Sequence, residues 1–244
     1  TFGDAGLFSL DKGKNITTIE GGIIVTRCDG MANALRAESE CLPASGLPGN
    51  FMTFVKVILY AAFLRPGLYW LPNRLPSLGI GSTVYSEEYP VEQYRPFLAR
   101  LGVRLLDRLR EISQVRIENA EFLMKELEGT PRLLLPTPVE KASPVFLRFP
   151  VRILDRKPRD RCIFELNRLG ISASPSYPGA INDIPEVRIG LSGEEIRLPE
   201  GRTLAGQILT LPTHPYVRRD DLVKMVDVLR QECTKEIPFG STPG

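Results

Sequence analysis

A lysine near the N-terminus is the residue best suited to covalent chemistry in this sequence. Lys14 has the hydroxyl of Ser9 five residues upstream and a second amine at Lys12. A lysine that captures an aldehyde must lose its proton, and burial or a neighbouring positive charge favours that loss. Lys12 supplies such a charge, Phe8 and Ile16 are apolar flanks, and the Ser9 hydroxyl could donate a hydrogen bond to a phosphate. The alternative interpretation is a solvated surface turn.

Other reactive side chains are scarce, which excludes several kinds of site. His214 is the single histidine, so a histidine-based triad or a multi-histidine metal centre is excluded. The four cysteines are far apart and form no Cys-x-x-Cys pair (Cys28, Cys41, Cys162 and Cys233). Since the first residues show no secretory signal, we interpret the cysteines as reduced thiols of a cytoplasmic protein.

The composition is that of an ordinary globular protein. The 244 residues include 31 Lys and Arg against 29 Asp and Glu, a net charge of +2, and 43% are hydrophobic. These values exclude a disordered chain, a collagen-like repeat and a basic nucleic-acid-binding tail. The length allows one large domain or up to two average ones. The 21 Gly and 21 Pro predict many turns.

Two short β-branched runs flank a glycine pair and predict a hairpin that positions Lys14. Residues 16–19 and 23–26 are rich in Ile, Val and Thr, and they lie on either side of Glu20-Gly21-Gly22. β-Branched residues favour strands, and paired glycines favour the tight turn between them. Lys14 is therefore expected just before the first strand.

The most apolar block of the chain, residues 51–71, predicts a helix. Its uncharged stretch is too short for a membrane-spanning helix, which needs about 20 apolar residues. We interpret it as a helix covered by other protein or by a partner subunit. The alternative is a helix lying at a membrane surface, with aromatic rings at the headgroups and basic side chains beside phosphates. Residues 72–90 predict a long irregular loop.

The second half of the sequence predicts a small α+β domain that begins with a long helix. Apolar residues recur every three or four positions over residues 96–128, opposite a charged face that we interpret as solvated. After this helix, strands and helices are expected to alternate: a strand at 145–151, a helix at 159–169, a strand at 208–211 and a helix at 220–231. Pro150 predicts a sheet edge or a bulge in the first of these strands, and Gly170 predicts the end of the helix at 159–169. The last helix has an apolar face formed by Leu222, Val223, Met225, Val226 and Leu229.

Residues 8–26 closely resemble the cofactor-lysine segment of the DegT/DnrJ/StrS family. The resemblance rests on Ser9, Lys14-Asn15 and Glu20-Gly21-Gly22, followed by an apolar strand. Two further landmarks follow in the family's order: residues 102–109 within the long helix, and residues 211–215 before a helix that opens with acidic residues. Members of this family are pyridoxal 5'-phosphate (PLP) enzymes, mostly aminotransferases of nucleotide-linked keto-sugars.

The resemblance implies a fold and a domain division. The implied fold class is α/β, the PLP-dependent transferase fold of the aspartate aminotransferase type. Residues 1–95 would be the C-terminal part of the large PLP-binding domain, with an apolar insertion at about 51–90. Residues 96–244 would be the small C-terminal α+β domain. Family members are commonly homodimers, so a homodimer is expected, and no nucleic-acid partner is expected.

The resemblance also implies roles for individual residues. Lys14 would bind PLP covalently and act as the base and acid of transamination, while Ser9 would hold the cofactor phosphate. A lysine at this position, where related dehydratases have a histidine, favours transamination. Glutamate is the expected amino donor and cell-surface polysaccharide biosynthesis the expected process. His214 is expected to have a structural role in its turn, and Tyr177 is a candidate near the substrate.

Several family features are absent from the sequence. Residues 91–95 contain no Asn, although the family has one there that reaches the phosphate in the neighbouring subunit. The carboxylate for the pyridinium nitrogen and the aromatic ring that stacks on it precede the lysine in the family, but only thirteen residues precede Lys14. We therefore expect the C-terminal part of a longer enzyme, which alone binds PLP poorly or not at all. The alternative is a non-catalytic remnant or partner subunit that keeps the small domain and the dimer surface.

Overall fold

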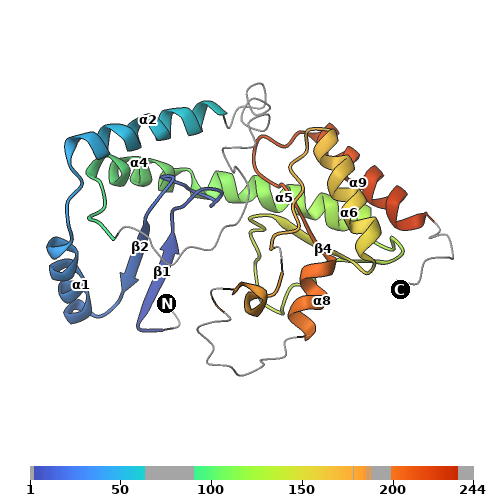
Figure 1. Ribbon diagram of the computed structural model, residues 1–244, viewed down its shortest axis with the longest axis horizontal. Coiled ribbons are helices and arrows are strands. Elements are labelled where there is room, and N and C mark those ends of the chain that lie inside the picture. The colour runs from blue at the N-terminus through green and yellow to red at the C-terminus, as the bar shows by residue number, and fades with distance from the viewer. Residues whose placement is uncertain (1–2, 64–90, 178, 186, 188–198, 236–244) are drawn as a thin grey trace. The chain divides into compact units, whose positions relative to one another are not determined.

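The structure, a computed structural model, describes residues 3–63, 91–177, 179–185, 187 and 199–235 (Figure 1). The chain divides into two compact units, Thr1–Ser113 and Gln114–Gly244, and each is described here by itself. The division between a large and a small domain at residues 95 and 96 stays a prediction.

The first unit begins with an antiparallel hairpin whose first strand is not the predicted one. Strand β1 (Ala5–Ser9) pairs with β2 (Gly22–Thr26), with Ala5 opposite Thr26 and Ser9 opposite Gly22. The prediction of a strand at residues 16–19 is therefore wrong, because these residues belong to the connecting loop. Thr17 explains the difference: its Oγ1 donates to the Leu10 carbonyl (3.0 Å) and accepts from the Ile19 N–H (2.9 Å). These side-chain bonds satisfy backbone groups that would otherwise join a sheet ladder.

Two helices follow the hairpin. Helix α1 (Asp29–Cys41) has no buried residue, which explains why the sequence has no apolar periodicity that predicts it. Helix α2 (Leu47–Phe63) confirms the helix predicted from the apolar block as far as residue 63; the rest of that block and the predicted loop at 72–90 lie outside the described residues. No helix in the described part of the chain is long and apolar enough to cross a lipid bilayer.

The predicted long helix is present with one interruption. Helix α4 (Pro96–Asp107) starts with proline at its first turn, where the missing N–H costs nothing, and α5 (Leu109–Leu127) follows after Arg108. The apolar face is buried where predicted, at Leu98 in the first unit and at Ala120, Leu123 and Leu127 in the second. The charged face of α4 is exposed, as expected.

A three-stranded antiparallel sheet forms the centre of the second unit, in the order β3-β4-β5. The strands are β3 (Leu133–Leu134), β4 (Phe149–Ile153) and β5 (Ile208–Leu211), and the last of these matches its prediction. The strand predicted at 145–151 starts four residues later, at Phe149.

Pro150 lies in the central strand, so its predicted position at a sheet edge is wrong. The backbone of its partner Thr210 bonds Ser174 on the other side (N···O 2.8 and 3.1 Å), so the pair of Pro150 and Thr210 is not hydrogen-bonded. The Pro150 nitrogen therefore points to the β3 side, where β3 pairs only with Ile153 and Arg152. No ladder bond is lost, which explains why the central strand tolerates proline.

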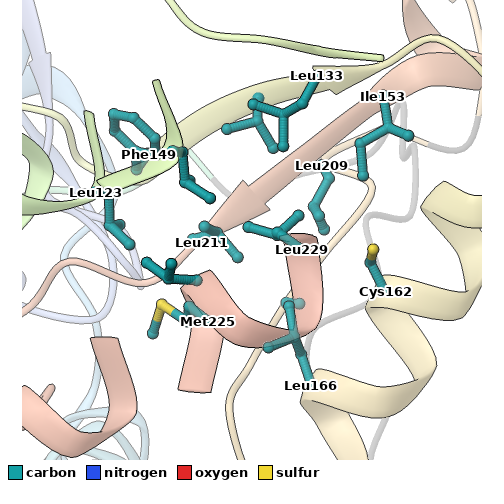
Figure 2. Packing of buried hydrophobic residues seen from close by; sticks show 14 of the residues in the cluster. Leu123, Leu133, Phe149, Ile153, Cys162, Leu166, Leu209, Leu211, Met225 and Leu229 are labelled. Atoms are coloured by element: carbon teal, nitrogen blue, oxygen red, sulfur yellow. The ribbon is translucent and has the colours of Figure 1, made fainter. Parts of the chain in front are cut away.

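Helices α6 (Arg156–Arg168), α8 (Pro199–Gln207) and α9 (Arg219–Thr234) complete this unit with a short 3₁₀ turn, Ile181–Asp183. Gly170 has a φ of +79° and terminates α6 as predicted. The core packs alternate residues of β4 with β5 and the helices (Figure 2): Leu123, Phe149, Val151, Ile153, Cys162, Leu166, Leu209, Leu211, Met225 and Leu229. The predicted buried face of α9 is right except at Val223, which is exposed because it falls beside the stripe of Leu222, Met225, Val226 and Leu229.

Candidate functional site

The loop that carries Lys14, residues 10–21, is held closed at its base; we call it the lysine loop. The Leu10 N–H donates to the Gly21 carbonyl (2.9 Å), and the Thr18 N–H donates to the Leu10 carbonyl (3.0 Å). The side chains of Leu10, Thr18 and Ile19 are buried. The loop is therefore a packed structure, which gives Lys14 a defined backbone position.

The structure places Lys14 and Ser9 on either side of Asp11. The Lys14 N–H donates to the Asp11 carbonyl (3.3 Å), and the Asp11 N–H donates to Ser9 Oγ (3.3 Å). Both Lys14 and Ser9 are exposed, and among the described residues the Lys14 amine has no hydrogen bond or ion pair. The apolar flank expected at Phe8 does not cover the amine, since Phe8 is 58% exposed. Lys14 is thus accessible to a ligand, and the roles of Lys14 and Ser9 stay predictions.

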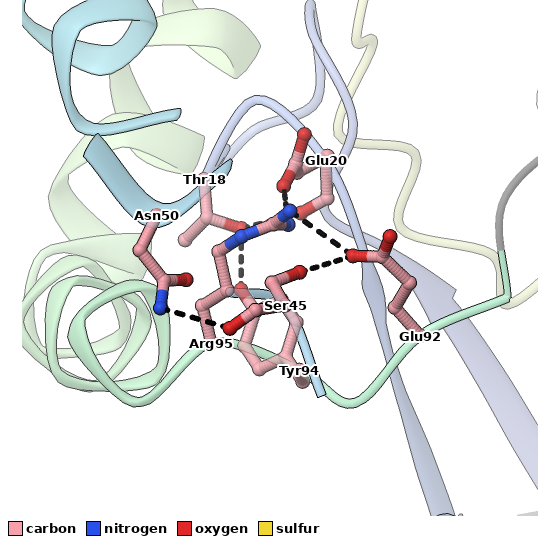
Figure 3. A network of polar contacts seen from close by, with 7 residues as sticks. All are labelled: Thr18, Glu20, Ser45, Asn50, Glu92, Tyr94 and Arg95. Carbon is pink, nitrogen blue, oxygen red and sulfur yellow. Dashed lines mark hydrogen bonds and ion pairs between the residues drawn. The ribbon is translucent and has the colours of Figure 1, made fainter. Parts of the chain in front are cut away.

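Tyr94 contacts the far end of the lysine loop (Figure 3). Its hydroxyl lies 2.5 Å from Thr18 Oγ1, which itself donates to the Glu20 carbonyl (2.9 Å). Because the single Thr18 proton is used in that bond, Tyr94 is the donor to Thr18. Burial and the nearby charge of Glu20 raise the pKa of Tyr94. Tyr94 therefore stays neutral and able to donate.

An ion-pair network lies beside this contact. Arg95 pairs with Glu20 of the lysine loop and with Glu92 (3.1 Å), and Ser45 donates a hydrogen bond to Glu92 (Figure 3). The Arg95 side chain is only 16% exposed. Sequence reasoning missed this network, because Glu20 and Arg95 are 75 residues apart and neither lies in a pattern that predicts a partner.

Gly21 should be the glycine of the loop least tolerant of a side chain. Gly21 and Gly13 both have positive φ (+91° and +80°), so alanine costs about 1 kcal/mol or more at either position. A Cβ on Gly21 would lie 2.2 Å from Cε2 of Tyr94, whereas a Cβ on Gly13 meets nothing within 4 Å. We expect Gly21→Ala to destabilise the loop by about 1–3 kcal/mol more than Gly13→Ala, measured by hydrogen exchange of the Leu10 and Thr18 amides. Equal exchange in the two variants would contradict the packing of Tyr94 on Gly21.

In the second unit, the turn after β5 is anchored on helix α5. Arg116 donates to the Leu147 carbonyl (2.7 Å) and to Thr213 Oγ1 (3.1 Å), and Asn119 donates to the Thr213 carbonyl (3.0 Å). The carbonyl of His214 accepts from the Val217 N–H (2.9 Å), and its ring packs edge-on against Tyr216. These contacts support the predicted structural role of His214.

His214 is expected to make the fold sensitive to mild acid. Burial, together with the positive charges of Arg116 and Arg148, lowers the pKa of His214 to about 4. Between about pH 6.5 and 4, His214 therefore binds a proton in the unfolded chain but not in the folded chain. The free energy of unfolding falls as the pH falls through this window. The loss should reach about 3 kcal/mol below pH 4 and be absent in His214→Gln. Because His214 is the single histidine, its ring resonance in an NMR titration is unambiguous. A midpoint near 6.5 would contradict the burial.

Tyr177, the candidate near the substrate, lies in the second unit and is 64% exposed. Its N–H donates to the Pro175 carbonyl (2.8 Å), and the preceding Ser176 has a φ of +65°, which is uncommon for a residue with a side chain. The role of Tyr177 near the substrate stays a prediction.

Comparison with known proteins identifies similar chains. The model of the DegT/DnrJ/EryC1/StrS aminotransferase family matches residues 92–230. A curated protein of Streptomyces venezuelae, dTDP-3-amino-3,4,6-trideoxy-alpha-D-glucose transaminase, is 30% identical over 112 residues, which are 46% of this chain and 28% of that protein.

Solved aminotransferase structures match almost the whole chain. DesV of S. venezuelae has a TM-score of 0.65 at 24% identity, covering 96% of this chain and 53% of its own. Spr1654 of Streptococcus pneumoniae, in its PMP form, has a TM-score of 0.68 at 17% identity, covering 96% of this chain and 54% of its own. PseC of Helicobacter pylori, described as involved in the biosynthesis of pseudoaminic acid, has a TM-score of 0.66 at 16% identity, with 95% and 53% covered. These likenesses confirm the predicted fold class, and the chain spans about half the length of the structures it matches.

Proposed function

Because the chain belongs to the DegT/DnrJ/EryC1/StrS aminotransferase family, we propose that it supplies the lysine-bearing part of a PLP-dependent aminotransferase. The observation that carries the proposal is the accessible amine of Lys14 on an ordered loop between β1 and β2. An amine that a ligand can reach from a fixed backbone position can capture an aldehyde cofactor once it has lost its proton.

The residues present fit one side of the cofactor. Lys14 would hold its aldehyde carbon, and the exposed Ser9 hydroxyl, linked to Lys14 through the Asp11 backbone, would donate to its phosphate. Bound PLP supplies an electron sink that stabilises negative charge at the substrate carbon. With its nitrogen free, Lys14 would accept the proton of the substrate carbon as a base and give it back as an acid.

The remaining walls of the site must come from outside this loop. Proton transfer at carbon needs a site from which water is excluded, and the Lys14 amine is exposed. We propose that the polypeptide corresponding to the other half of the matched structures encloses Lys14 and provides the carboxylate for the ring nitrogen. The 244-residue chain by itself should then bind PLP weakly.

Borohydride reduction with PLP, followed by peptide mass mapping, tests the proposal. The expected result is a pyridoxyl group on Lys14 in the complete enzyme, with much less on Lys12, two residues away. Predominant label on another lysine would overturn the assignment. Tight, stoichiometric PLP binding by the 244-residue chain in a spectrophotometric titration would overturn the proposal that other polypeptide completes the cofactor site.

The proposed substrate is a nucleotide-linked keto-sugar, with glutamate as amino donor and cell-surface polysaccharide biosynthesis as the process, in the cytoplasm. Support comes from the curated relative, whose name is that of a dTDP-amino-sugar transaminase, and from PseC. Amino transfer from glutamate to a dTDP-linked keto-sugar, followed by mass spectrometry, tests this specificity. Transfer only to a free sugar or a keto acid would contradict it.

Helix α2 has an exposed apolar face that needs a cover. Phe51, Met52 and Phe54 are 69%, 57% and 51% exposed, and Lys56 is the single charged residue of the helix. We propose that a second copy covers this face in a homodimer; the alternative cover is a membrane surface. Sedimentation analysis of Phe51→Ser should show loss of the dimer. A dimer that persists, with co-sedimentation on phosphatidylglycerol vesicles that Phe51→Ser abolishes, would favour the membrane.

A further inference from the structure

We propose that Tyr94 and Arg95 are positioning residues for Lys14: they latch the lysine loop onto the start of helix α4 and thereby set where the amine is presented. The inference rests on the proposed function of Lys14. It goes beyond that function because it assigns a positioning role to two residues that contact neither Lys14 nor Ser9.

The first argument is backbone strain at the point where the latch acts. Ile19 has a φ of +68°, which a β-branched residue adopts rarely, and Gly21 has a φ of +91°. Such a conformation persists only where the surrounding contacts hold it, and it occurs preferentially at functional sites. The two residues flank Glu20, to which Arg95 is paired.

The second argument is that Tyr94 contacts both ends of the strained turn. Its hydroxyl donates to Thr18 Oγ1, and its ring packs against Gly21 so closely that a Cβ there would lie 2.2 Å from Cε2. Thr18 is fully buried, and its Cγ2 lies 3.7 Å from where a Cβ on Gly102 of α4 would be. Tyr94 therefore contacts both ends of the turn, and α4 lies close to Thr18.

The third argument is the charge arrangement. The largely buried Arg95 lies between the carboxylates of Glu20 and Glu92, and Glu92 is itself anchored by Ser45 from the segment between α1 and α2 (Figure 3). Removing the guanidinium would leave two like charges without their shared partner. The lysine loop is thereby tied to two other segments of the first unit.

The latch reaches Lys14 through the loop backbone. Residues 18 and 21 hold both backbone groups of Leu10, Asp11 forms a bridge with Ile19, and the Asp11 carbonyl accepts the Lys14 N–H. Each step is a hydrogen bond or bridge between neighbouring backbone groups, so a displaced turn at 18–21 displaces residues 11–14. The Tyr60 hydroxyl of α2 accepts from the Gly13 N–H (3.3 Å) and provides a second support on the other side of Lys14.

The test compares three variants of the 244-residue chain with the wild type. Tyr94→Phe removes only the hydroxyl, Arg95→Ala removes the charge, and Arg95→Lys restores a charge. Arg100→Ala, an exposed arginine of α4, is the control. Hydrogen exchange of the Leu10 and Thr18 amides should rise about 3- to 10-fold in Tyr94→Phe and more in Arg95→Ala, with partial recovery in Arg95→Lys and no change in Arg100→Ala.

A second readout separates positioning from general stability. In the complete enzyme, with PLP and borohydride, the ratio of label on Lys14 to label on Lys12 should exceed one in the wild type and fall toward one in Tyr94→Phe and Arg95→Ala. A wild type that labels the two lysines equally overturns the proposed function. Preferential labelling of Lys14 that survives both substitutions, or exchange that they leave unchanged, overturns the latch alone.

Discussion

Replacing Lys14 by alanine should lower the rate of amino transfer by the complete enzyme by at least roughly 10²–10⁴-fold, the range expected for loss of one proton-transfer group. The loss should be greater where the amine also attaches the cofactor. Lys14→Arg should fail as severely, because a guanidinium keeps its charge but does not lose its proton to attack an aldehyde. The measurement is the initial rate of amino transfer from glutamate to a dTDP-linked keto-sugar.

The adjacent lysine provides a matched control for this prediction. Lys12 lies in the same loop and is also exposed, so Lys12→Ala removes the same charge two residues away. Its rate should stay within about threefold of the wild type if Lys12 is a solvated surface residue. Full activity in Lys14→Ala with loss in Lys12→Ala would transfer the catalytic role to Lys12. Partial restoration of Lys14→Ala by a small added amine would support the role of the missing nitrogen.

Leu229→Ala should lower the free energy of unfolding by about 2–5 kcal/mol, the range expected when a fully buried leucine is truncated. Leu229 lies on α9 with 0% exposure, and it packs in the core with Leu166 and Leu209 (Figure 2). Truncation removes buried methyl groups and leaves a cavity that the neighbouring helices and sheet fill only in part. Urea unfolding followed by circular dichroism measures the change.

Leu204→Ala is the matched control for the core. It makes the same chemical change in a helix of the same unit, but Leu204 of α8 is 42% exposed. We expect a loss below about 1 kcal/mol, since little apolar surface returns to water. Comparable losses at Leu204 and Leu229 would contradict the placement of α9 against the sheet.

Amide exchange at the lysine loop and unfolding of the core variant test different units of the chain. Leu229→Ala acts in the second unit, whereas Gly21→Ala and Tyr94→Phe act on residues 10–21 of the first. Substitutions without shared partners are expected to be additive. A combined variant should therefore show the sum of the two effects on unfolding, and a departure from that sum would reveal coupling between the units.

The sequence by itself determined the elements whose signal is local. The periodic apolar residues of 96–128 and of α9 predicted their helices, Gly170 predicted the end of α6, and residues 208–211 predicted β5. Periodicity and capping work within a few residues of the chain, so no distant partner is needed to recognise them. The segment around Lys14 was recognisable for the same reason, since Ser9, Lys14-Asn15 and Glu20-Gly21-Gly22 are close together in sequence.

The tertiary structure decided what depends on partners far along the chain. Residues 16–19 have strand-forming side chains, yet the Thr17 and Thr18 hydroxyls take up backbone groups and Tyr94, 76 residues from Thr18, closes the loop. Pro150 occupies a central strand because Thr210 turns its backbone to Ser174. Neither outcome has a local signal, because a hydrogen bond or a packed ring depends on which distant residue folding brings to it. The type of the reactive residue was thus legible in the sequence, whereas the contacts that hold its loop were set by the fold.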